Sequence, residues 1–517
     1  MSSTKLKTDN KIKENLPKVS NDCQISDKAK KGIVKEKKDK PKFKEYTLEK
    51  SKIIKTVNEM FPKIIKDDNG LLYMYDEKKK YFIEMKDNPI KSDIEELIYK
   101  TWLVIDRKKD EEGNEKPPEY KYLDVGKMNN LKKIIKRAIN FKKLESPPDN
   151  LINCRNGVID LSVQDKFKRL ISNDYIRKKY FFNYILDIDY NPQANKEKLQ
   201  NFIESVVTEE EPLITIAKIL GHIQYSGAKL QKGFLFLGTR NGRNGKGTLT
   251  KLITKTIGES RSLTKSIEDF QNGLFEKYQL KDKTLYVEDD YKQGHIDDKT
   301  LSFLNKLISG AEENVQQKHS PAINIKYKAT PIIQSNKMLK LKADDDGGFY
   351  LRWVIVHFNN EFGNSDKVDE FLGESLLNDK DVMSSMLNLL IWGYIELISR
   401  KKANIKGNFF KDNESKDIEN WKIENNSALQ FTQDCCVLKN DKYVVSRDLF
   451  KYYKDVWNCG GGKLSETKFI KEIREHYNLD KIRKYTKNNK KINCLEGLHF
   501  IDDDDAAKII NFENRVI

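Results

Sequence analysis

The chain has 517 residues, 34% of them charged, and a formal net charge of +16. This length accommodates about three or four domains, and the charge favours a polyanionic partner such as a nucleic acid, although a generally lysine-rich sequence accounts for it equally well. Six dispersed cysteines without a CxxC pair argue against a zinc site or a disulfide framework and favour a cytoplasmic protein. The longest apolar stretch, 386–398, is interrupted by polar residues, so it predicts a buried helix and no membrane span.

The N-terminal part divides into a tail and a mixed domain. Residues 1–45 are rich in lysine and nearly free of aromatic residues, which predicts a disordered basic tail. Residues 46–195 combine helix and strand signals and predict an α+β domain. Within it, residues 70–84 are expected to form a hairpin, and an Asn-Gly turn inside the apolar segment 151–161 predicts a second one.

Residues 196–400 show the pattern of an α/β ATPase domain. Helical periodicity extends to about residue 232, and short apolar strands then alternate with helices from 233 to about 360. Further helices are predicted from there to about residue 400. A charged segment, 401–426, is predicted to be a linker.

The most informative segment joins an apolar strand to a helix through a glycine-rich turn, Phe234–Thr248. In such a turn, backbone N–H groups and the helix N-terminus point at an anion, and a lysine adds a mobile positive charge. The spacing departs from the P-loop pattern, because Arg240 stands where that pattern has glycine and a glycine follows the lysine. An ordinary turn between a strand and a helix is the alternative. The predicted phosphate-binding residues are Gly242, Asn244, Gly245, Lys246, Gly247 and Thr248, the last supplying a hydroxyl for Mg²⁺.

Two further apolar strands end in polar residues suited to nucleotide hydrolysis. The first ends in three consecutive acids, of which Glu288 and Asp289 directly follow the apolar run. These two are favoured as the residues that hold Mg²⁺ and orient the attacking water. The sequence does not decide which acid has which role, and a solvated acidic turn that includes Asp290 is the alternative. The second strand, 330–335, is followed by Asn336, whose amide is suited to contact the γ-phosphate or the water.

These three motifs, together with Arg352 and the apolar strand after it, resemble those of superfamily 3 helicases. More closely, they resemble the helicase half of phage, plasmid and poxvirus-type primase-helicases, over about residues 70–517 and most specifically over 196–360. The resemblance implies ATP and Mg²⁺ as cofactors, with Asn336 as a sensor of the γ-phosphate. It also implies that Arg352 is an arginine finger that reaches a neighbouring subunit, so that the protein works as a ring, usually a hexamer.

The resemblance further implies a hairpin that binds single-stranded DNA. In the sequence, this hairpin would lie between the acidic strand and Asn336. Residues 309–319 occupy this interval, and Lys318 and His319 are predicted to lie at or near its tip, where a lysine contacts phosphates. An exposed charged turn is the alternative, especially for His319. Many relatives carry a primase domain ahead of the helicase. Too few residues precede the shared region here, so a separate primase or polymerase is the expected partner.

Residues 427–517 are predicted to form a winged-helix-like DNA-binding domain. Two helices, 446–457 and one with Ser465 as its N-cap, precede a probable hairpin whose basic residues are not interrupted by acids. This composition suits contact with the backbone of double-stranded DNA, and a protein-interaction domain of the same fold is the alternative. The predicted contacts are Lys484, Lys487, Lys490 and Lys491.

The sequence therefore predicts a multidomain α/β protein with an AAA+-like P-loop ATPase core, an N-terminal α+β domain and a C-terminal winged-helix domain. The predicted function is an ATP-dependent replicative DNA helicase of a phage, virus or mobile element, which translocates on single-stranded DNA as a ring. One alternative is an ATP-regulated, DNA-binding replication initiator without unwinding activity. The other is a small-molecule nucleotide kinase, suggested by the Gly-Lys-Gly-Thr order at 245–248.

Overall fold

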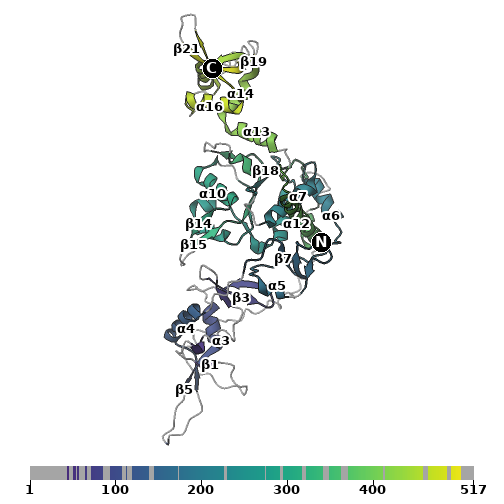
Figure 1. Cartoon of the computed structure of the whole chain (residues 1–517), viewed down its shortest axis with the longest axis vertical. Coiled ribbons are helices and arrows are strands. Elements are labelled where there is room, and N and C mark those ends of the chain that lie inside the picture. The colour runs from purple at the N-terminus through teal and green to yellow at the C-terminus, as the bar shows by residue number, and fades with distance from the viewer. Residues whose placement is uncertain are drawn as a thin grey trace, which may run out of the picture. The chain divides into compact units, whose positions relative to one another are not determined.

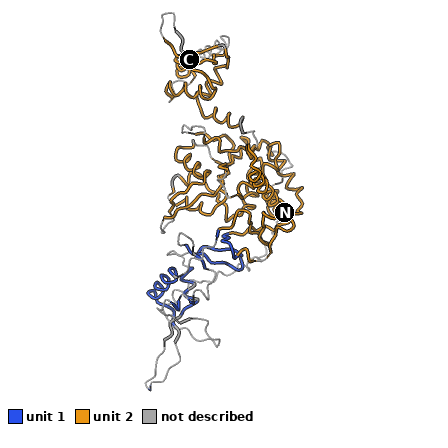
Figure 2. The backbone as a smooth tube through the Cα atoms, viewed as in Figure 1, with its two compact units in different colours: residues 1–145, 178–183 blue, residues 146–177, 184–517 orange. Residues whose placement is uncertain are grey.

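The computed structural model divides into two compact units, which Figure 2 distinguishes by colour. Unit 1 comprises residues 1–145 and 178–183, and unit 2 comprises residues 146–177 and 184–517. The predicted tail, 1–45, lies outside the described residues except for Lys44 and Glu45. The structure describes residues 44–45, 51–53, 55–56, 64–66, 71–85, 93–106, 112, 119–138, 145–172, 174–225, 230–273, 275–291, 295–316, 322–341, 348–362, 369, 371–410, 414–457, 464–485 and 491–501.

The described part of unit 1 combines two small sheets with the helices α3 and α4. One sheet has the strand order β1-β5-β6, and the other is antiparallel with the order β2-β3-β4. The hairpin predicted at 70–84 is confirmed, because β3 pairs with β4 in antiparallel register. The bounds are β1 Lys44–Glu45, β2 Ile64–Lys66, β3 Leu72–Asp76, β4 Tyr81–Glu84, α3 Asp93–Thr101, β5 Trp102–Asp106, β6 Glu119–Lys121 and α4 Val125–Ala138.

An apolar core joins the two helices of unit 1. Ile94 and Ile98 lie one turn apart on α3, and Leu131 and Ile135 lie one turn apart on α4. This spacing gives each helix a single apolar stripe, and the two stripes share one buried cluster. The mixed composition of strands and helices agrees with the α+β character that the sequence predicted for this region.

The centre of unit 2 is a five-stranded parallel sheet with the order β11-β12-β16-β10-β18. Its inner strands are almost entirely buried, as expected for parallel strands covered on both faces. The alternation of strands and helices predicted after residue 233 is confirmed. Because the strands are parallel, the carboxyl ends of β10, β12 and β16 lie at one edge of the sheet. The bounds are β10 Gly233–Gly238, β11 Ser262–Thr264, β12 Leu285–Glu288, β16 Thr330–Ser335 and β18 Trp353–Phe358.

Helices α7 (Pro212–Gln224) and α12 (Lys380–Lys402) lie side by side in unit 2 (Figure 1). Their backbones touch at two glycines. A Cβ added at Gly393 would lie 1.8 Å from the carbonyl oxygen of Ala217, and one added at Gly221 would lie 2.2 Å from the carbonyl carbon of Gly393. Only glycine permits this approach.

The apolar helix α12 contains the buried helix that the sequence predicted at 386–398. Among the described residues it is the one helix whose length and composition would suffice to cross a membrane, but 61% of its apolar window is buried inside the protein. Its packing against α7 explains why these residues are apolar.

The other elements around the sheet include the hairpin β14–β15, whose strands pair in antiparallel register from Glu312↔Lys326 to Val315↔Ile323. This hairpin falls in the interval predicted for it, while Lys318 and His319 lie outside the described residues. The bounds are α6 Glu197–Val206, α8 Lys246–Ile257, α9 Ile267–Asn272, β13 His295–Ile296, α10 Asp298–Ser309, β14 Glu312–Val315, β15 Ile323–Lys326, β17 Lys340–Leu341 and α11 Leu372–Asn378.

The second predicted hairpin is also present, but it belongs to unit 2. Strands β7 (Leu151–Cys154) and β8 (Gly157–Asp160) pair across the Asn-Gly turn, and β9 (Leu170–Ile171) pairs with β8. The boundary between the units therefore differs from the domain boundary predicted at residue 195. Hydrogen bonds tie this segment to the core of unit 2: the Gln224 side chain donates to the Asp149 carbonyl at 2.8 Å, and the Asn191 N–H donates to Ser384 Oγ at 2.9 Å.

The predicted linker, 401–426, contains an ordered helix, α13 (Glu414–Asn425). Ile418 and Trp421 are buried in the apolar cluster beside β18 and β16, and Trp421 Nε1 donates to the Leu339 carbonyl at 2.7 Å. Asn425 receives a hydrogen bond from the Leu341 N–H at 2.7 Å. This charged segment therefore packs against the core through these few apolar residues.

The C-terminal region has its own core and a three-stranded sheet of order β19-β21-β20. The two predicted helices and the hairpin are present, and Ser465 accepts a hydrogen bond from the Lys468 N–H as the predicted N-cap of α16. Strand β19 was not predicted. The bounds are α14 Ser427–Cys435, β19 Cys436–Val445, α15 Ser446–Tyr452, a π-helical turn Tyr453–Trp457, α16 Glu466–His476, β20 Lys481–Tyr485 and β21 Lys491–Phe500.

Candidate functional site

The glycine-rich turn connects the carboxyl end of β10 to the first residue of α8. Gly242 and Gly245 have positive φ angles of 67° and 81°, which glycine adopts without strain. A Cβ added at Gly245 would lie 2.4 Å from Val206 Cγ1 at the end of α6. Gly245 is also the N-cap of α8, and no side chain caps this helix, so its first N–H groups remain available to an anion.

Two side-chain nitrogens converge at the end of β10. A Cβ added at Gly238 would lie 1.9 Å from Lys246 Nζ and 2.1 Å from Asn244 Nδ2, so only glycine leaves room for both. Lys246 Nζ donates a hydrogen bond to Asn336 Oδ1, and burial lowers the pKa of the lysine. Asn244 is 3% exposed, and within the described part of the chain its Nδ2 has no hydrogen-bond partner. A buried donor without a partner, next to a lysine, fits an oxyanion.

The three consecutive acids after β12 occupy different environments. Asp289 accepts a hydrogen bond from Gln334 Nε2 at 2.8 Å. Glu288 is buried and accepts from the Ile267 N–H at the start of α9, and burial raises the pKa of this carboxyl to about 7. Asp290 has a positive φ of 61°. Its negative charge raises the pKa of Lys246, but burial of the lysine has the larger effect and lowers this pKa overall.

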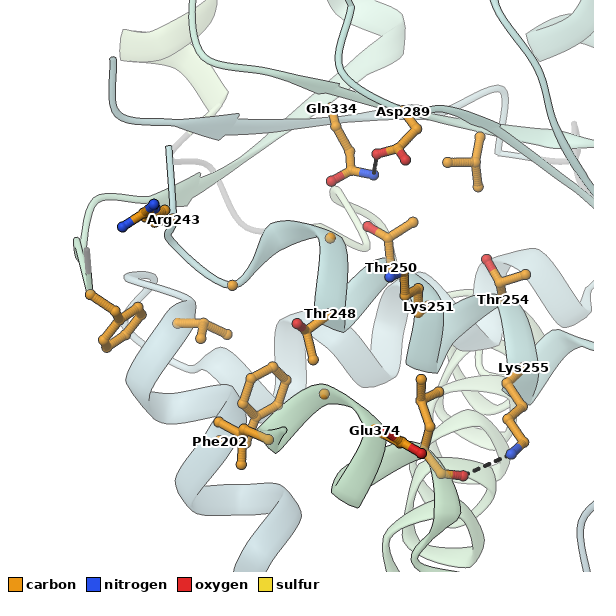
Figure 3. A pocket seen from close by; sticks show the side chains of 18 of the residues that line it. Phe202, Arg243, Thr248, Thr250, Lys251, Thr254, Lys255, Asp289, Gln334 and Glu374 are labelled. Atoms are coloured by element: carbon orange, nitrogen blue, oxygen red, sulfur yellow. Dashed lines mark hydrogen bonds between the residues drawn. The ribbon is translucent and has the colours of Figure 1, made fainter. Parts of the chain in front are cut away.

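A cavity of about 1370 Å³ lies beside the turn and α8 (Figure 3). Of the predicted site residues, Gly245, Gly247, Thr248 and Asp289 line it. Gln334 and Asp289 project from the strand ends on one side, and Thr248 projects from α8 on another (Figure 3). Further lining residues are Phe202 and Val206 of α6, Phe362, Leu372, Gly373 and Glu374 near α11, and Thr250, Lys251, Thr254 and Lys255 of α8.

Gly238 and Gln334 are the site residues that sequence reasoning missed. Gly238 lies outside the expected glycine spacing, and its role depends on side chains that arrive from the turn, from the start of α8 and from the end of β16. Gln334 could have been found, because it is the single amide within the strand Thr330–Ser335 and directly follows its apolar run.

The donor set fits a nucleotide polyphosphate with Mg²⁺. Lys246, Asn244 and the uncapped start of α8 supply positive charge and N–H groups, while Thr248 and Asp289 supply oxygen ligands of the kind that Mg²⁺ prefers. The described residues contain no cluster of three or more His, Cys, Asp or Glu side chains that would hold a metal by themselves. Phosphate oxygens would therefore complete the coordination.

Arg352 lies away from this site. It directly precedes β18, and Trp353 pairs with Gly233 at the start of β10, so Arg352 sits at the amino-end edge of the sheet. Its Nη1 donates to Asn305 Oδ1 at 2.6 Å. Since β10 has six residues, the strand separates Arg352 from the turn by roughly 15–20 Å.

The predicted C-terminal DNA contacts are only partly described. Lys491 is exposed at the start of β21, where it pairs with Tyr485 of β20. For Lys484, the structure describes the backbone position in β20, opposite Ile492. Lys487 and Lys490 lie outside the described residues.

Family models match three parts of the chain. The D5 N terminal like model matches residues 29–208, and the poxvirus D5 protein-like model matches residues 423–508. Between them, residues 237–352, which include the glycine-rich turn, match a family of unknown function (DUF5906). The two D5-type matches support a relationship to primase-helicase-like replication proteins, as the motifs predicted.

Two solved structures that show low overall similarity to this chain are both of the NrS-1 C terminal region. "The A form apo structure of NrS-1 C terminal region-CTR" is 14% identical, with a TM-score of 0.36, and the match covers 60% of this chain and 78% of that chain. "The apo structure of NrS-1 C terminal region (305-718)" is also 14% identical, with a TM-score of 0.35 and the same coverage. No curated protein matches the chain.

Proposed function

We propose that this protein is an ATP-dependent DNA helicase of superfamily 3 that acts in the replication of a phage, virus or mobile element. The observation that carries the proposal is the convergence of Lys246, Asn336 and Asp289 at the carboxyl ends of three parallel strands. Ligands of open α/β sheets bind at this edge. The D5-type matches, which precede and follow the residues of the sheet in the sequence, support a role in DNA replication.

ATP with Mg²⁺ supplies the phosphoanhydride bond and a cation that offsets charge on the transferred phosphoryl group. Lys246 and the start of α8 bind the phosphates, and Thr248 and Asp289 hold the metal. Asn336 donates its amide N–H to the γ-phosphate or positions the attacking water, while its Oδ1 holds Lys246.

The position of Arg352 supports a site shared between subunits of a ring, which we propose is a hexamer. Within one chain the strand length keeps Arg352 away from the turn, so a role for Arg352 in hydrolysis would require the turn of a neighbouring subunit. Mixing Arg352→Ala subunits with Lys246→Ala subunits is expected to restore part of the hydrolysis that each variant lacks alone. Absence of any restoration would exclude a shared site.

ATP hydrolysis and strand displacement on a tailed duplex test the helicase proposal directly. Single-stranded DNA is expected to stimulate hydrolysis, and Lys246→Ala is expected to abolish hydrolysis and displacement together. Lys299→Ala, an exposed lysine of α10, is the matched control and is expected to retain both activities. Sequence-specific duplex binding without displacement would favour the initiator, and stimulation by nucleosides in place of DNA would favour the kinase.

A further inference from the structure

We propose that Gln334 is a positioning residue that holds Asp289 as the metal-side carboxylate of the nucleotide site. This inference rests on the proposed function, because it concerns the same cavity. It also separates the roles of the consecutive acids Glu288 and Asp289, which the sequence left undecided.

Gln334 fixes the turn after β12 at two points. Its Nε2 donates to Asp289 Oδ1 at 2.8 Å, and its backbone carbonyl accepts from the Tyr291 N–H at 2.8 Å. Asp290, between these two residues, has a positive φ of 61°. The turn is therefore attached to β16 on both sides of its strained residue, which fixes the direction of the Asp289 side chain.

The hydrogen bond leaves a carboxylate oxygen for the cavity. It engages Oδ1 of Asp289, while Asp289 and Gln334 both line the cavity opposite Thr248 (Figure 3). A metal held between Thr248 and Asp289 would therefore meet a carboxylate whose orientation is already set. Groups that orient a metal ligand in this way contribute to metal affinity although they do not touch the metal.

The surroundings of Gln334 explain why an amide occupies this position. The side chain is 4% exposed and lies on a strand whose residues are all buried. A buried amide donor without a partner would be costly, and an ionised carboxylate is a strong acceptor for it. An apolar residue would pack equally well there but would leave Asp289 without its partner.

Glu288 is committed elsewhere. Its carboxylate accepts hydrogen bonds from the Ile267 N–H and from the Tyr286 hydroxyl, and it is not among the residues that line the cavity. Glu288 therefore holds the start of α9, and Asp289 is the acid that faces the nucleotide.

The test compares Gln334→Met, which keeps the size of the side chain but removes the donor, with wild type. The matched control is Gln224→Met, which replaces another buried glutamine that is not among the residues lining the cavity. Binding of a fluorescent ATP analogue is measured in EDTA and then across a Mg²⁺ titration. We expect binding in EDTA to be unchanged, and the Mg²⁺ concentration at half-maximal effect to rise by about 10-fold for Gln334→Met and not for the control.

A double-mutant cycle with Asp289→Asn shows whether Gln334 acts through Asp289. Gln334→Met is expected to add nothing further in the Asp289→Asn background, because its partner is already altered. Independent, additive effects would overturn the proposal, as would a folded Gln334→Met protein with a wild-type Mg²⁺ requirement. If Gln334→Met fails to fold, Gln334→Asn, whose amide is too short to reach Asp289, carries the same expectation.

The same measurements distinguish failure of this inference from failure of the proposed function. A wild-type protein that binds ATP with Mg²⁺ but displaces no strand would contradict the helicase proposal, while the Mg²⁺ titration would still decide the role of Gln334. A wild-type protein that binds no nucleotide would overturn both.

Discussion

Lys246 and Asn336 are 90 residues apart in the sequence, yet the ammonium group of the first donates a hydrogen bond to the amide oxygen of the second. The bond connects the first residue of α8 with the residue that follows β16, and β16 is a neighbour of β10 in the sheet. Because the lysine is already held in place, a phosphate entering the turn meets a fixed positive charge. We propose that Asn336 responds through this bond to any movement of Lys246.

Gly238→Ala is expected to abolish nucleotide binding without unfolding the protein. The added methyl group would fall within 2.1 Å of both Lys246 Nζ and Asn244 Nδ2, and these flexible side-chain ends would move away from the phosphate position. Calorimetric titration with ATP and Mg²⁺ measures the loss, and thermal unfolding monitors the fold. Gly126→Ala, in α4 and outside the site, is the matched comparison and is expected to keep wild-type binding, since its added Cβ would meet only Asp124 Oδ1 at 3.3 Å. Wild-type affinity in Gly238→Ala would show that the position of Lys246 is not required.

Glu288→Gln is expected to change how stability depends on pH. Burial raises the pKa of Glu288 to about 7, so the folded protein retains a proton that the unfolded chain releases above about pH 4.5. This carboxyl therefore makes the free energy of unfolding fall as the pH rises from about 4.5 to about 7. Glutamine keeps an acceptor for the Ile267 N–H and has no charge.

Chemical unfolding at pH 5, 6, 7 and 8 measures this effect. The stability of Glu288→Gln relative to wild type is expected to increase with pH across the window and to level off above it. A constant difference between the two proteins would contradict the buried, proton-binding environment of Glu288.

Trp421→Ala is expected to destabilise unit 2 by about 3–5 kcal/mol, the usual range for removing a fully buried aromatic side chain. Trp421 is completely buried, contacts Phe349 and Tyr350, and loses its hydrogen bond to the Leu339 carbonyl in this variant. Asn420→Ala, on the exposed side of α13, is the control and should stay within about 0.5 kcal/mol of wild type. Equal stability of the two variants would show that α13 does not contribute to the core and acts only as a linker.

Lys491→Gln is expected to weaken binding to double-stranded DNA and to reduce the salt dependence of binding. Loss of one phosphate contact lowers the slope of log affinity against log salt by about 1. Fluorescence anisotropy at several salt concentrations measures this slope. Lys471→Gln, an exposed lysine on α16 outside the β20–β21 hairpin, is the matched control. The same slope of log affinity against log salt in both variants would show that Lys491 makes no specific contact with DNA phosphates.

The strongest sequence predictions rested on local patterns. Apolar runs bounded by glycine, asparagine or charged residues indicated β10, β16 and the hairpins β3–β4 and β7–β8, because strand and turn chemistry is largely decided within a few residues. The segment predicted as a linker, 401–426, shows the limit of such patterns. Ile418 and Trp421 give α13 its place in the core, and two apolar residues in a charged segment are a weak local signal.

The sequence by itself determined the order of the site motifs: a glycine-rich turn with Lys246, then the acids, then Asn336, then Arg352. Only the tertiary structure decided which of these side chains meet. Parallel pairing of β10, β12 and β16 brings Lys246, Asp289 and Asn336 to one edge of the sheet, and the direction of β18 places Arg352 at the other. It also gave Asp289 the partner Gln334 and buried Glu288 against α9. The physical reason is that strand order and register are fixed by burial across the whole sheet, which no single segment of the sequence encodes.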